Sequence, residues 1–529
     1  MSKVNENVVK VTQGKLRGAV HRNVLDGSSY VAFKGIPFAA PPVGNLRFKD
    51  PQPLPPWSDI KDVSKDVEYF CTQMDQYSPG KLIGDEDCLY LNVYTNSCDQ
   101  SKPIMFWIYG GSFIVGTGSS IHTSPDYLLA KDVVVVTTNY RLGAFGFLNL
   151  KHPAAPGNMG LKDLIAALEW VQQNIANFGG DPNNVTVFGG SAGAILTHAL
   201  AVSPCAKGLF HKAICQSGSL LCPFGVKQSR PERGFKLASL LGMDSTDPEE
   251  VVEFLRTVPA AKIVEATNSI LQPEENIIFD LPFGINSDAV ADRPVLPLPI
   301  EQLLSNDANI PIIIGYMTHE LLTFVKDKSE KAMSMYNHYL PLFVKNLVLL
   351  EDSEDKKMTE LMRAVKNRYF DGQPITADKI NNVLEFFTDV YVYIPMQIYV
   401  ENRLNRKSSP TYVYKYSYVG NEMTCADFLS KRLLNRASHG DELSYLFYSP
   451  IFKAENPEPP AVGTKDRITI ERLTRMWTNF AKTGNPTPSH DEFIKTTWKP
   501  ATKNKRNCLE IGDDVKLLMA APHILSDGF

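Results

Sequence analysis

The chain alternates between short apolar runs and longer amphipathic segments. Continuous apolar runs of this kind are typical of strands covered on both faces in a parallel sheet. They occupy residues 103–109, 133–141, 185–189, 213–217 and 310–316, and a further strand-like segment covers residues 411–419. Between them, residues 161–178 repeat apolar side chains at a spacing near 3.6 and stop at Gly179 and Gly180, which predicts a helix with a glycine end. Further helices are predicted around residues 249–256, 356–369, 381–399 and 466–483.

This order of elements predicts the fold class. Strands that alternate with helices favour an α/β fold with a mostly parallel central sheet flanked by helices. The strand-like segments near both termini, such as residues 8–20, are expected to extend the sheet as antiparallel edge strands.

Composition narrows the classes of partner. The 529 residues are 43% hydrophobic and 21% charged, with a formal net charge of −4, as in ordinary globular proteins. Such a balance argues against a nucleic-acid or anionic-membrane partner, which needs a basic surface. The longest apolar runs are too short to span a bilayer, and the first residues lack a signal-peptide pattern. Together with eight scattered cysteines and no CxxC pair, these features lead us to expect a cytoplasmic protein.

The segment VTVFGGSAGAIL (residues 185–196) contains a G-x-S-x-G pattern between a strand and a helix. Glycines at both ends of the pattern allow a sharp turn, which lifts the hydroxyl of Ser191 clear of the sheet at a helix N-terminus. A plain glycine turn is the alternative interpretation, but the flanking strand and helix favour a nucleophile.

A nucleophilic serine requires donors for the developing oxyanion. The segment FWIYGGSFIVG (residues 106–116) is a strand that ends in a glycine loop ahead of the serine. We therefore predict oxyanion donors at the backbone N–H groups of Gly111, Ser112 and Ala192.

The orienting acid and the base are expected later in the chain, in the order serine, acid, histidine. Glu320 follows the predicted strand 310–316, and His439 lies in the loop after residues 411–419. His319 competes with His439 because it neighbours Glu320. Adjacent side chains point in different directions, so His319 is a poor partner for Glu320, and we predict a triad of Ser191, Glu320 and His439.

These motifs together resemble the type-B carboxylesterase/cholinesterase family of α/β-hydrolases, and most of all the insect carboxylesterases. The resemblance extends over nearly the whole chain. It rests on FKGIPFAAPPVGNLRFKDPQP, GDEDCLYLNVYT, NYRLGAFGFLNL, GNMGLKDLIAALEWVQQNIANFGGDPNNVTVFGGSAGA, SHGDELSYLF and WTNFAKTGNP.

The resemblance implies one α/β-hydrolase domain over residues 1–529, with large helical insertions around an active-site gorge. It implies the same triad and oxyanion donors. It further implies that Ser217 supports the triad, that Phe224 lines the acyl pocket, and that Cys88 has a disulfide partner, which Cys71 could supply. Phe324 and Tyr391 or Tyr393 are weaker candidates for the pocket walls. We expect the cysteine pair to be reduced in the cytosol.

Two positions depart from the family pattern. Members of the family usually have glutamate immediately before the nucleophile, whereas this chain has Gly190. The lost negative charge should give the imidazolium less support in the transition state and slow acylation. The third glycine of the oxyanion loop is replaced by Ser112, which retains the N–H but should add mild strain and crowd bulky acyl groups.

The leading hypothesis is a serine carboxylesterase that needs no metal or organic cofactor and acts on small-molecule esters, xenobiotic or lipophilic. In agreement, HELL lacks the second histidine of HExxH, and neither a P-loop nor a full GxGxxG occurs. One alternative is a slow esterase that sequesters acylating or phosphorylating ligands; another is a non-catalytic binding member of the fold. We expect a monomer.

Overall fold

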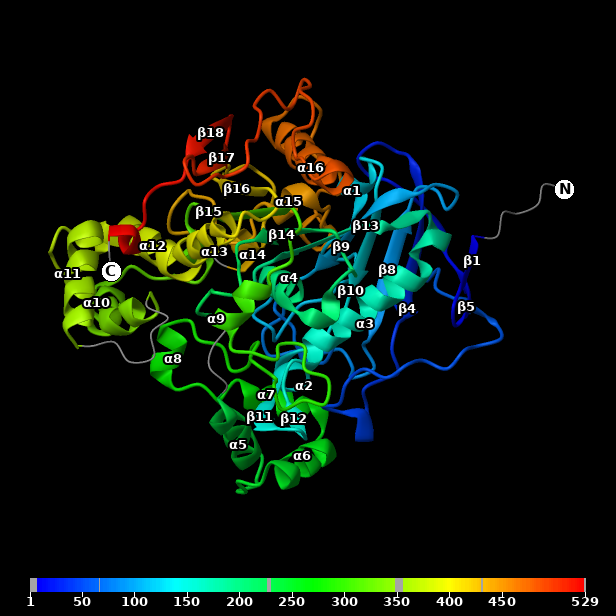
Figure 1. The fold of residues 1–529 in the computed structure, drawn as a ribbon, viewed down its shortest axis with the longest axis horizontal. Coiled ribbons are helices and arrows are strands. Elements are labelled where there is room, and N and C mark those ends of the chain that lie inside the picture. The colour runs from blue at the N-terminus through cyan, green and yellow to red at the C-terminus, as the bar shows by residue number, and fades with distance from the viewer. Residues whose placement is uncertain (1–6, 66, 226–229, 348–354, 430–431, 528–529) are drawn as a thin grey trace.

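An eleven-stranded mixed sheet runs through the centre of the molecule (Figure 1). The computed structural model describes residues 7–527 apart from residues 66, 226–229, 348–354 and 430–431. In spatial order the strands are β18 (Val515–Met519), β17 (Asn507–Ile511), β16 (Thr411–Tyr416), β15 (Ile312–Met317), β14 (Lys212–Gln216), β13 (Gly180–Gly190), β9 (Lys102–Ile108), β10 (Val134–Thr138), β8 (Tyr90–Thr95), β4 (Ser29–Pro37) and β3 (Ala19–Arg22).

The strands from β17 to β10 run parallel to one another. Antiparallel strands complete both edges, with β8, β4 and β3 on one side and β18 on the other. Their apolar composition follows from burial: every residue of β10, for example, is buried. The predicted α/β fold with a mostly parallel sheet is therefore confirmed.

The N-terminal strands differ from the prediction. β1 (Val8–Val11) and β2 (Gly14–Arg17) form a separate three-stranded sheet with β5 (Ile60–Asp62), so the expectation that all of residues 8–20 would extend the main sheet is wrong. The reason is pairing: the edge of β2 that β1 leaves open is occupied by β5 in parallel register. Within this region only β3 joins the main sheet. Two small hairpins pair β6 (Gln73–Met74) with β7 (Leu82–Ile83) and β11 (Asn149–His152) with β12 (Ala155–Pro156).

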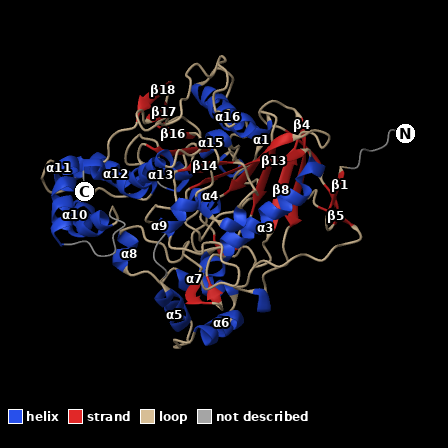
Figure 2. Ribbon diagram, viewed as in Figure 1, coloured by secondary structure: helices blue, strands red, loops and turns tan. Residues whose placement is uncertain are grey.

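Helices cover both faces of the sheet (Figures 1 and 2). In these views α16 lies on one side of the central strands, and α3 and α4 lie on the other. Beyond the sheet, α5–α7 form one group and α10–α12 another, in agreement with the implied helical insertions. The helices are α1 (Asp126–Leu129), α2 (Gly143–Phe147), α3 (Met159–Asn174), α4 (Ala192–Val202), α5 (Pro231–Leu240), α6 (Pro248–Thr257), α7 (Ala260–Thr267), α8 (Pro273–Ile277), α9 (Ile300–Leu303), α10 (Glu330–Lys345), α11 (Asp355–Phe370), α12 (Ile380–Thr388), α13 (Ile394–Asn405), α14 (Cys425–Leu429), α15 (Leu443–Leu446) and α16 (Lys465–Thr483).

Cys71 and Cys88 are joined by a disulfide. The pairing implied by the family resemblance is thus present, and the expectation of a reduced pair is not met in this structure. The bond closes the segment that carries β6 and β7.

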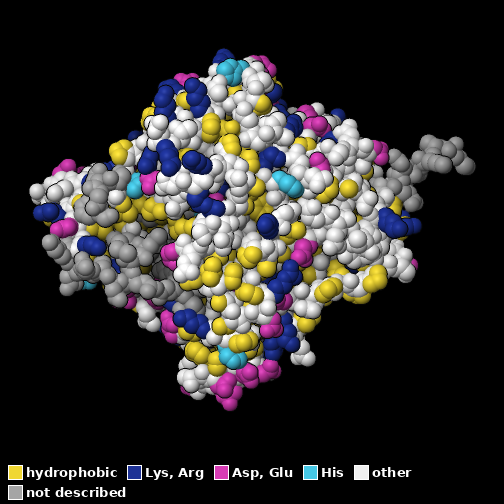
Figure 3. All heavy atoms as spheres, in the orientation of Figure 1, with side chains coloured by type: hydrophobic (Ala, Val, Ile, Leu, Met, Phe, Trp, Pro, Cys, Tyr) yellow, Lys and Arg dark blue, Asp and Glu magenta, His cyan; other side chains and the backbone are white. Residues whose placement is uncertain are grey.

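On the face shown in Figure 3, lysine and arginine side chains are interspersed with aspartate and glutamate. Among the helices of the described ranges, none combines the length and the apolar character needed to cross a bilayer.

Candidate active site

Ser191 occupies the turn between β13 and α4, with φ 57° and ψ −126°. Non-glycine residues rarely adopt such angles, and strain of this kind concentrates at functional turns. Two sets of hydrogen bonds maintain the turn. The Ser191 N–H donates to the Gln216 carbonyl at 2.8 Å, and the Ser191 carbonyl accepts from the N–H groups of Ala194 and Ile195 at 2.9 and 3.1 Å. The serine is therefore held between the end of β14 and the first turn of α4.

Close backbone contacts explain the glycines around the serine. A Cβ atom on Gly189 would lie 2.4 Å from the Gly193 carbonyl oxygen, and one on Gly193 would lie 2.1 Å from the Ile108 carbonyl oxygen. Gly190 differs, because the nearest atom to a Cβ there is Trp107 Cη2 at 3.6 Å. Gly189 and Gly193 are thus required by the turn, whereas Gly190 has room for a Cβ atom.

The structure joins the predicted acid to the predicted base. His439 Nδ1 lies 2.6 Å from Glu320 Oε2, although 119 residues separate them. The other carboxylate oxygen, Oε1, accepts the Met317 N–H at 2.8 Å. Glu320 begins a short 3-10 turn after β15 and is 1% exposed, so its carboxylate is fixed in one orientation. The competing residue His319 makes a different contact, from Nε2 to Asn381 Oδ1 at 3.0 Å.

The loops that carry the acid and the base are attached to each other by a short bridge. His319 and Ser438 form an isolated parallel β-bridge, one residue before Glu320 and His439 respectively. The Ser438 hydroxyl lies 2.6 Å from Thr323 Oγ1 and accepts the Thr323 N–H at 3.1 Å. These contacts set the register in which the two side chains meet.

The electrostatic surroundings favour the imidazolium form of His439. Burial alone would lower the pKa of His439, but the charge of Glu320 and its hydrogen bond outweigh that effect and raise the pKa above the usual value of 6.5. The carboxyl groups of Glu442 and Asp441 act in the same direction.

Glu442 is a second buried carboxyl group in the site and was not identified from the sequence. Its Oε1 accepts from Gln216 Nε2 at 2.8 Å, and its Oε2 is buried with no hydrogen-bond partner among the described residues. Burial, together with the charge of Glu320, raises the pKa of Glu442 to about 7, against the effect of the Gln216 hydrogen bond. The backbone carbonyl of Gln216 also accepts the Ser191 N–H, so Gln216 links Glu442 to the backbone of the nucleophile.

The predicted oxyanion loop is folded into a turn after β9. Gly111 has φ 112°, and a Cβ there would lie 2.1 Å from the Val115 carbonyl oxygen. Ser112 adopts φ 56°, so the predicted left-handed strain is present. Within the described ranges, no acceptor is recorded for the backbone N–H of Gly111 or Ser112, or for that of Ala192, which opens α4. Gly110 lies directly against the nucleophile, since a Cβ on it would be 2.9 Å from Ser191 Cβ.

Ser217 lies at the end of β14, close to the nucleophile. It has φ 54°, it is 1% exposed, and its hydroxyl has no hydrogen-bond partner among the described residues. The next residue, Gly218, packs against Ser191, because a Cβ there would lie 2.7 Å from the Ser191 carbonyl oxygen. A strained backbone with an unpaired buried hydroxyl fits a residue that supports the site.

Aromatic side chains lie around the acid and base. The Phe324 ring centroid is 6.1 Å from that of His439, and the side chain is 46% exposed. Phe279 lies 6.2 Å from Phe324 and 5.7 Å from Tyr391. Tyr391 in turn lies 6.5 Å from Phe224. The structure therefore brings the three predicted wall residues, Phe224, Phe324 and Tyr391, into one connected group.

Tyr393, the alternative to Tyr391, does not belong to that group. Its ring packs 4.8 Å from Tyr316, and its hydroxyl donates to the Ala521 carbonyl.

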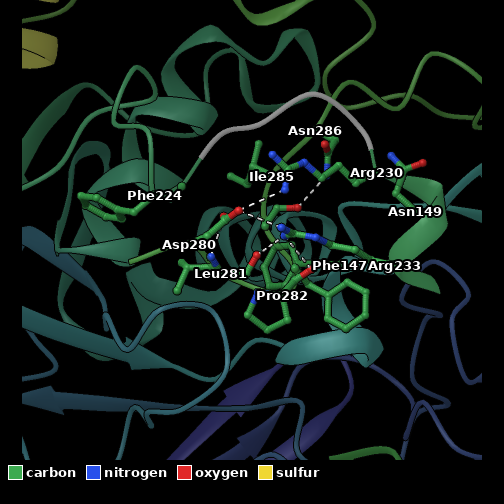
Figure 4. A pocket seen from close by; sticks show the side chains of 13 residues that line it. Phe147, Asn149, Phe224, Arg230, Arg233, Asp280, Leu281, Pro282, Ile285 and Asn286 are labelled. Atoms are coloured by element: carbon green, nitrogen blue, oxygen red, sulfur yellow. Dashed lines mark hydrogen bonds and ion pairs between the residues drawn. The ribbon is translucent and has the colours of Figure 1, made fainter. Parts of the chain in front are cut away.

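A small cavity of about 30 Å³ lies beside Phe224, and its lining includes two arginines (Figure 4). Arg230 Nη1 and Arg233 Nη2 both point at Asp280 Oδ2, at 3.0 and 2.8 Å. Glu275 accepts from both guanidinium groups as well. The arginines are thus already neutralised, and this cluster is a structural ion pair beside the predicted acyl pocket.

The part of the chain that the structure describes contains no group of three or more His, Cys, Asp or Glu side chains that could hold a metal ion. The described residues supply a serine hydroxyl on a strained turn, an imidazole paired with a buried carboxylate, and backbone N–H groups on the turns after β9 and β13. Such a set supports acyl transfer through a serine nucleophile.

Comparison with known proteins places these observations in a family. The sequence model of the Carboxylesterase family matches residues 5–523. Esterase FE4 of Myzus persicae is 33% identical over 514 residues, with 94% of this chain and 88% of that protein covered. Juvenile hormone esterase of Tribolium castaneum is 31% identical, with 96% and 88% covered. The crystal structure of juvenile hormone esterase from Manduca sexta, with OTFP covalently attached, superimposes with a TM-score of 0.84 at 29% identity, covering 98% of this chain and 97% of that one.

Proposed function

The chain belongs to the carboxylesterase family, and we propose that it hydrolyses lipophilic or xenobiotic carboxylic esters through an acyl-enzyme on Ser191. The observation that carries this proposal is the 2.6 Å contact between His439 Nδ1 and Glu320 Oε2. The strained turn at Ser191 supports it.

The contact with Glu320 assigns the roles of the two imidazole nitrogens. An ionised carboxylate can only accept a hydrogen bond, so Nδ1 of His439 carries the proton and Nε2 keeps its lone pair. Nε2 can then take the proton of the Ser191 hydroxyl as the Oγ attacks the ester carbonyl carbon. The imidazolium that forms is stabilised by Glu320, which stays ionised.

The remaining steps follow from the same groups. As the carbonyl π electrons move to oxygen, the N–H groups of Gly111, Ser112 and Ala192 donate to the oxyanion. Collapse of the tetrahedral intermediate breaks the bond to the alcohol oxygen, which receives the proton from His439, and the acyl group remains on Ser191. A water molecule then repeats the sequence, with His439 as base, and releases the acid.

The substrate class rests on the aromatic walls and on the relatives. Phe324, Phe279 and Tyr391 present apolar surface next to His439, which suits an acyl or alcohol group that is itself apolar. Two of the matched relatives are named juvenile hormone esterases, and a third is Esterase FE4 of Myzus persicae. These names favour lipophilic esters for this chain as well.

A slow esterase that sequesters its ligands is the second candidate. Two features favour it: the left-handed Ser112 in the oxyanion turn, and Gly190 at the position where the family resemblance implies a glutamate. Both changes should weaken transition-state stabilisation while they leave the nucleophile in place.

Pre-steady-state hydrolysis of nitrophenyl acetate and butyrate tests both candidates. A hydrolase should show sustained turnover that Ser191→Ala abolishes, whereas a sequestering protein should show a stoichiometric burst followed by very slow release. If the wild-type protein gave neither a burst nor turnover, both proposals would fail and a non-catalytic binding role would replace them.

A further inference from the structure

Gln73 connects the disulfide-closed segment to the oxyanion turn. Its side-chain amide pairs with the backbone of Gly116 in both directions: Oε1 accepts the Gly116 N–H at 2.7 Å, and Nε2 donates to the Gly116 carbonyl at 2.8 Å. Nε2 also donates to the Cys71 carbonyl at 2.9 Å. Gln73 is 2% exposed, so these bonds are protected from water.

Gly116 ends the turn that carries the predicted donors. Its φ is 121°, and a Cβ there would lie 2.6 Å from the Gly110 carbonyl oxygen and 2.4 Å from Tyr109 Cδ2. The Gly116 backbone is therefore packed against the two residues that precede Gly111. A shift of Gly116 would be transmitted to them directly.

Inside the turn, the Gly111 carbonyl accepts from the N–H groups of Ile114 and Val115, both at 3.0 Å. In a trans peptide the carbonyl and the following N–H point in opposite directions. Fixing the Gly111 carbonyl therefore fixes the direction of the Ser112 N–H, one of the predicted oxyanion donors. The orientation depends on the closed turn, and Gln73 closes its far end.

We propose that Gln73 is a positioning residue for the oxyanion hole: its amide holds Gly116 and thereby aims the N–H groups of Gly111 and Ser112. This inference rests on the proposed ester hydrolysis. Its physical basis is that an oxyanion donor misplaced by about 1 Å loses much of its effect on the transition state, while substrate binding depends on other contacts.

The test compares Gln73→Ala with a matched control, Gln172→Ala. The Gln172 amide on α3 also donates to two backbone carbonyls, those of Pro182 and Leu209, at 2.8 and 2.9 Å, but it contacts no residue of the site. We expect Gln73→Ala to lower kcat for nitrophenyl butyrate about 10- to 100-fold with KM within about twofold. Gln172→Ala should keep kcat within about twofold of the wild type.

Inhibitor binding separates positioning from a general loss of structure. A trifluoromethyl ketone forms an oxyanion on Ser191, so Gln73→Ala should weaken its Ki by the same factor as kcat. The corresponding secondary alcohol forms no oxyanion, and its Ki should not change. Gln73→Glu provides a second variant if Gln73→Ala does not fold, because the carboxylate can accept from Gly116 but cannot donate to its carbonyl.

The possible outcomes distinguish a failure of the role of Gln73 from a failure of the proposed ester hydrolysis. If the wild-type protein turned over and Gln73→Ala had the same kcat as Gln172→Ala, the role of Gln73 would be overturned. The esterase proposal would remain intact. An equal loss of alcohol and ketone binding would also overturn it. A wild-type protein with no Ser191-dependent turnover would overturn both.

Discussion

Glu320 and His439 face each other at 2.6 Å, and the acid is held on its other side by the Met317 N–H. The carboxylate therefore cannot turn away from the imidazole without losing a buried hydrogen bond. This arrangement fixes both the tautomer of His439 and the direction in which its pKa is shifted.

The first prediction concerns Glu320→Gln. The amide cannot stabilise the imidazolium, and its NH2 group can favour the wrong tautomer, so kcat should fall by about 10³- to 10⁴-fold. Since a neutral His439 is required as base and its pKa is raised, wild-type kcat/KM should decline as the pH falls through a value above 6.5. In Glu320→Gln the decline should shift to lower pH.

A pH profile of nitrophenyl acetate hydrolysis measures both effects. The control is Glu385→Gln, which removes an exposed carboxylate that contacts Asn381, the partner of His319. That variant should keep the wild-type profile. An unchanged acid limb in Glu320→Gln would show that Glu320 does not support His439.

Gly190 offers a second test, because a Cβ atom there would make only ordinary van der Waals contacts. Gly190→Glu should raise kcat/KM for a simple ester about 3- to 10-fold, since a carboxylate near His439 favours the imidazolium of the transition state. Gly190→Gln has the same size without the charge and should give no gain. Equal rates for the two variants would attribute any effect to shape, and a loss in Gly190→Glu would contradict the electrostatic explanation.

Much of this site could be predicted from local patterns. Ser191 is flanked by glycines that the turn requires, and Gly111 follows an apolar strand. The local sequence therefore predicts each of these turns. Glu320 and His439 were identified from the chain order serine, acid, histidine and from their positions after predicted strands.

Other features depend on contacts between residues that are far apart in the sequence, and local patterns do not predict them. The contact of Gln216 with Glu442 spans 226 residues, and either residue alone resembles an ordinary strand end or loop acid. The pairing of Gln73 with Gly116 and of β2 with β5 likewise becomes visible only when the folded segments are in place. The disulfide state of Cys71 depends on its surroundings as well as on its spacing.

The third prediction concerns Ser112→Gly. Glycine adopts φ 56° without the steric cost of a side chain, so the free energy of unfolding should rise by about 1 kcal/mol. Removal of the hydroxymethyl group should also shift preference toward longer acyl chains. Lys407→Gly is the control, because Lys407 is exposed, has φ 54° and lies on a turn after α13. It should gain similar stability with no change in the butyrate-to-acetate ratio. An unaltered ratio in Ser112→Gly would refute the crowding of bulky acyl groups.

The fourth prediction concerns Glu442 and the pH dependence of stability. Its pKa in the folded protein is about 7, above the value near 4.3 expected in the unfolded chain. The folded protein therefore retains this proton between about pH 4.5 and 7 while the unfolded chain loses it. Stability supplied by the protonated carboxyl is present below that window and is lost as the pH rises through it.

Glu442→Gln should remove this dependence, because glutamine cannot ionise and its Oε1 can still accept from Gln216. Between pH 4.5 and 8 the variant should gain about 2–3 kcal/mol of unfolding free energy relative to the wild type, at 1.36 kcal/mol for each unit of pKa difference. Urea titrations at the two pH values measure the gain, with the exposed Glu455→Gln as a control that should show none. If the difference between Glu442→Gln and the wild type were the same at both pH values, Glu442 would already be ionised in the folded protein. Its charge would then act on His439 between pH 4.5 and 8. It would replace the charge of the glutamate that the family resemblance implies at position 190.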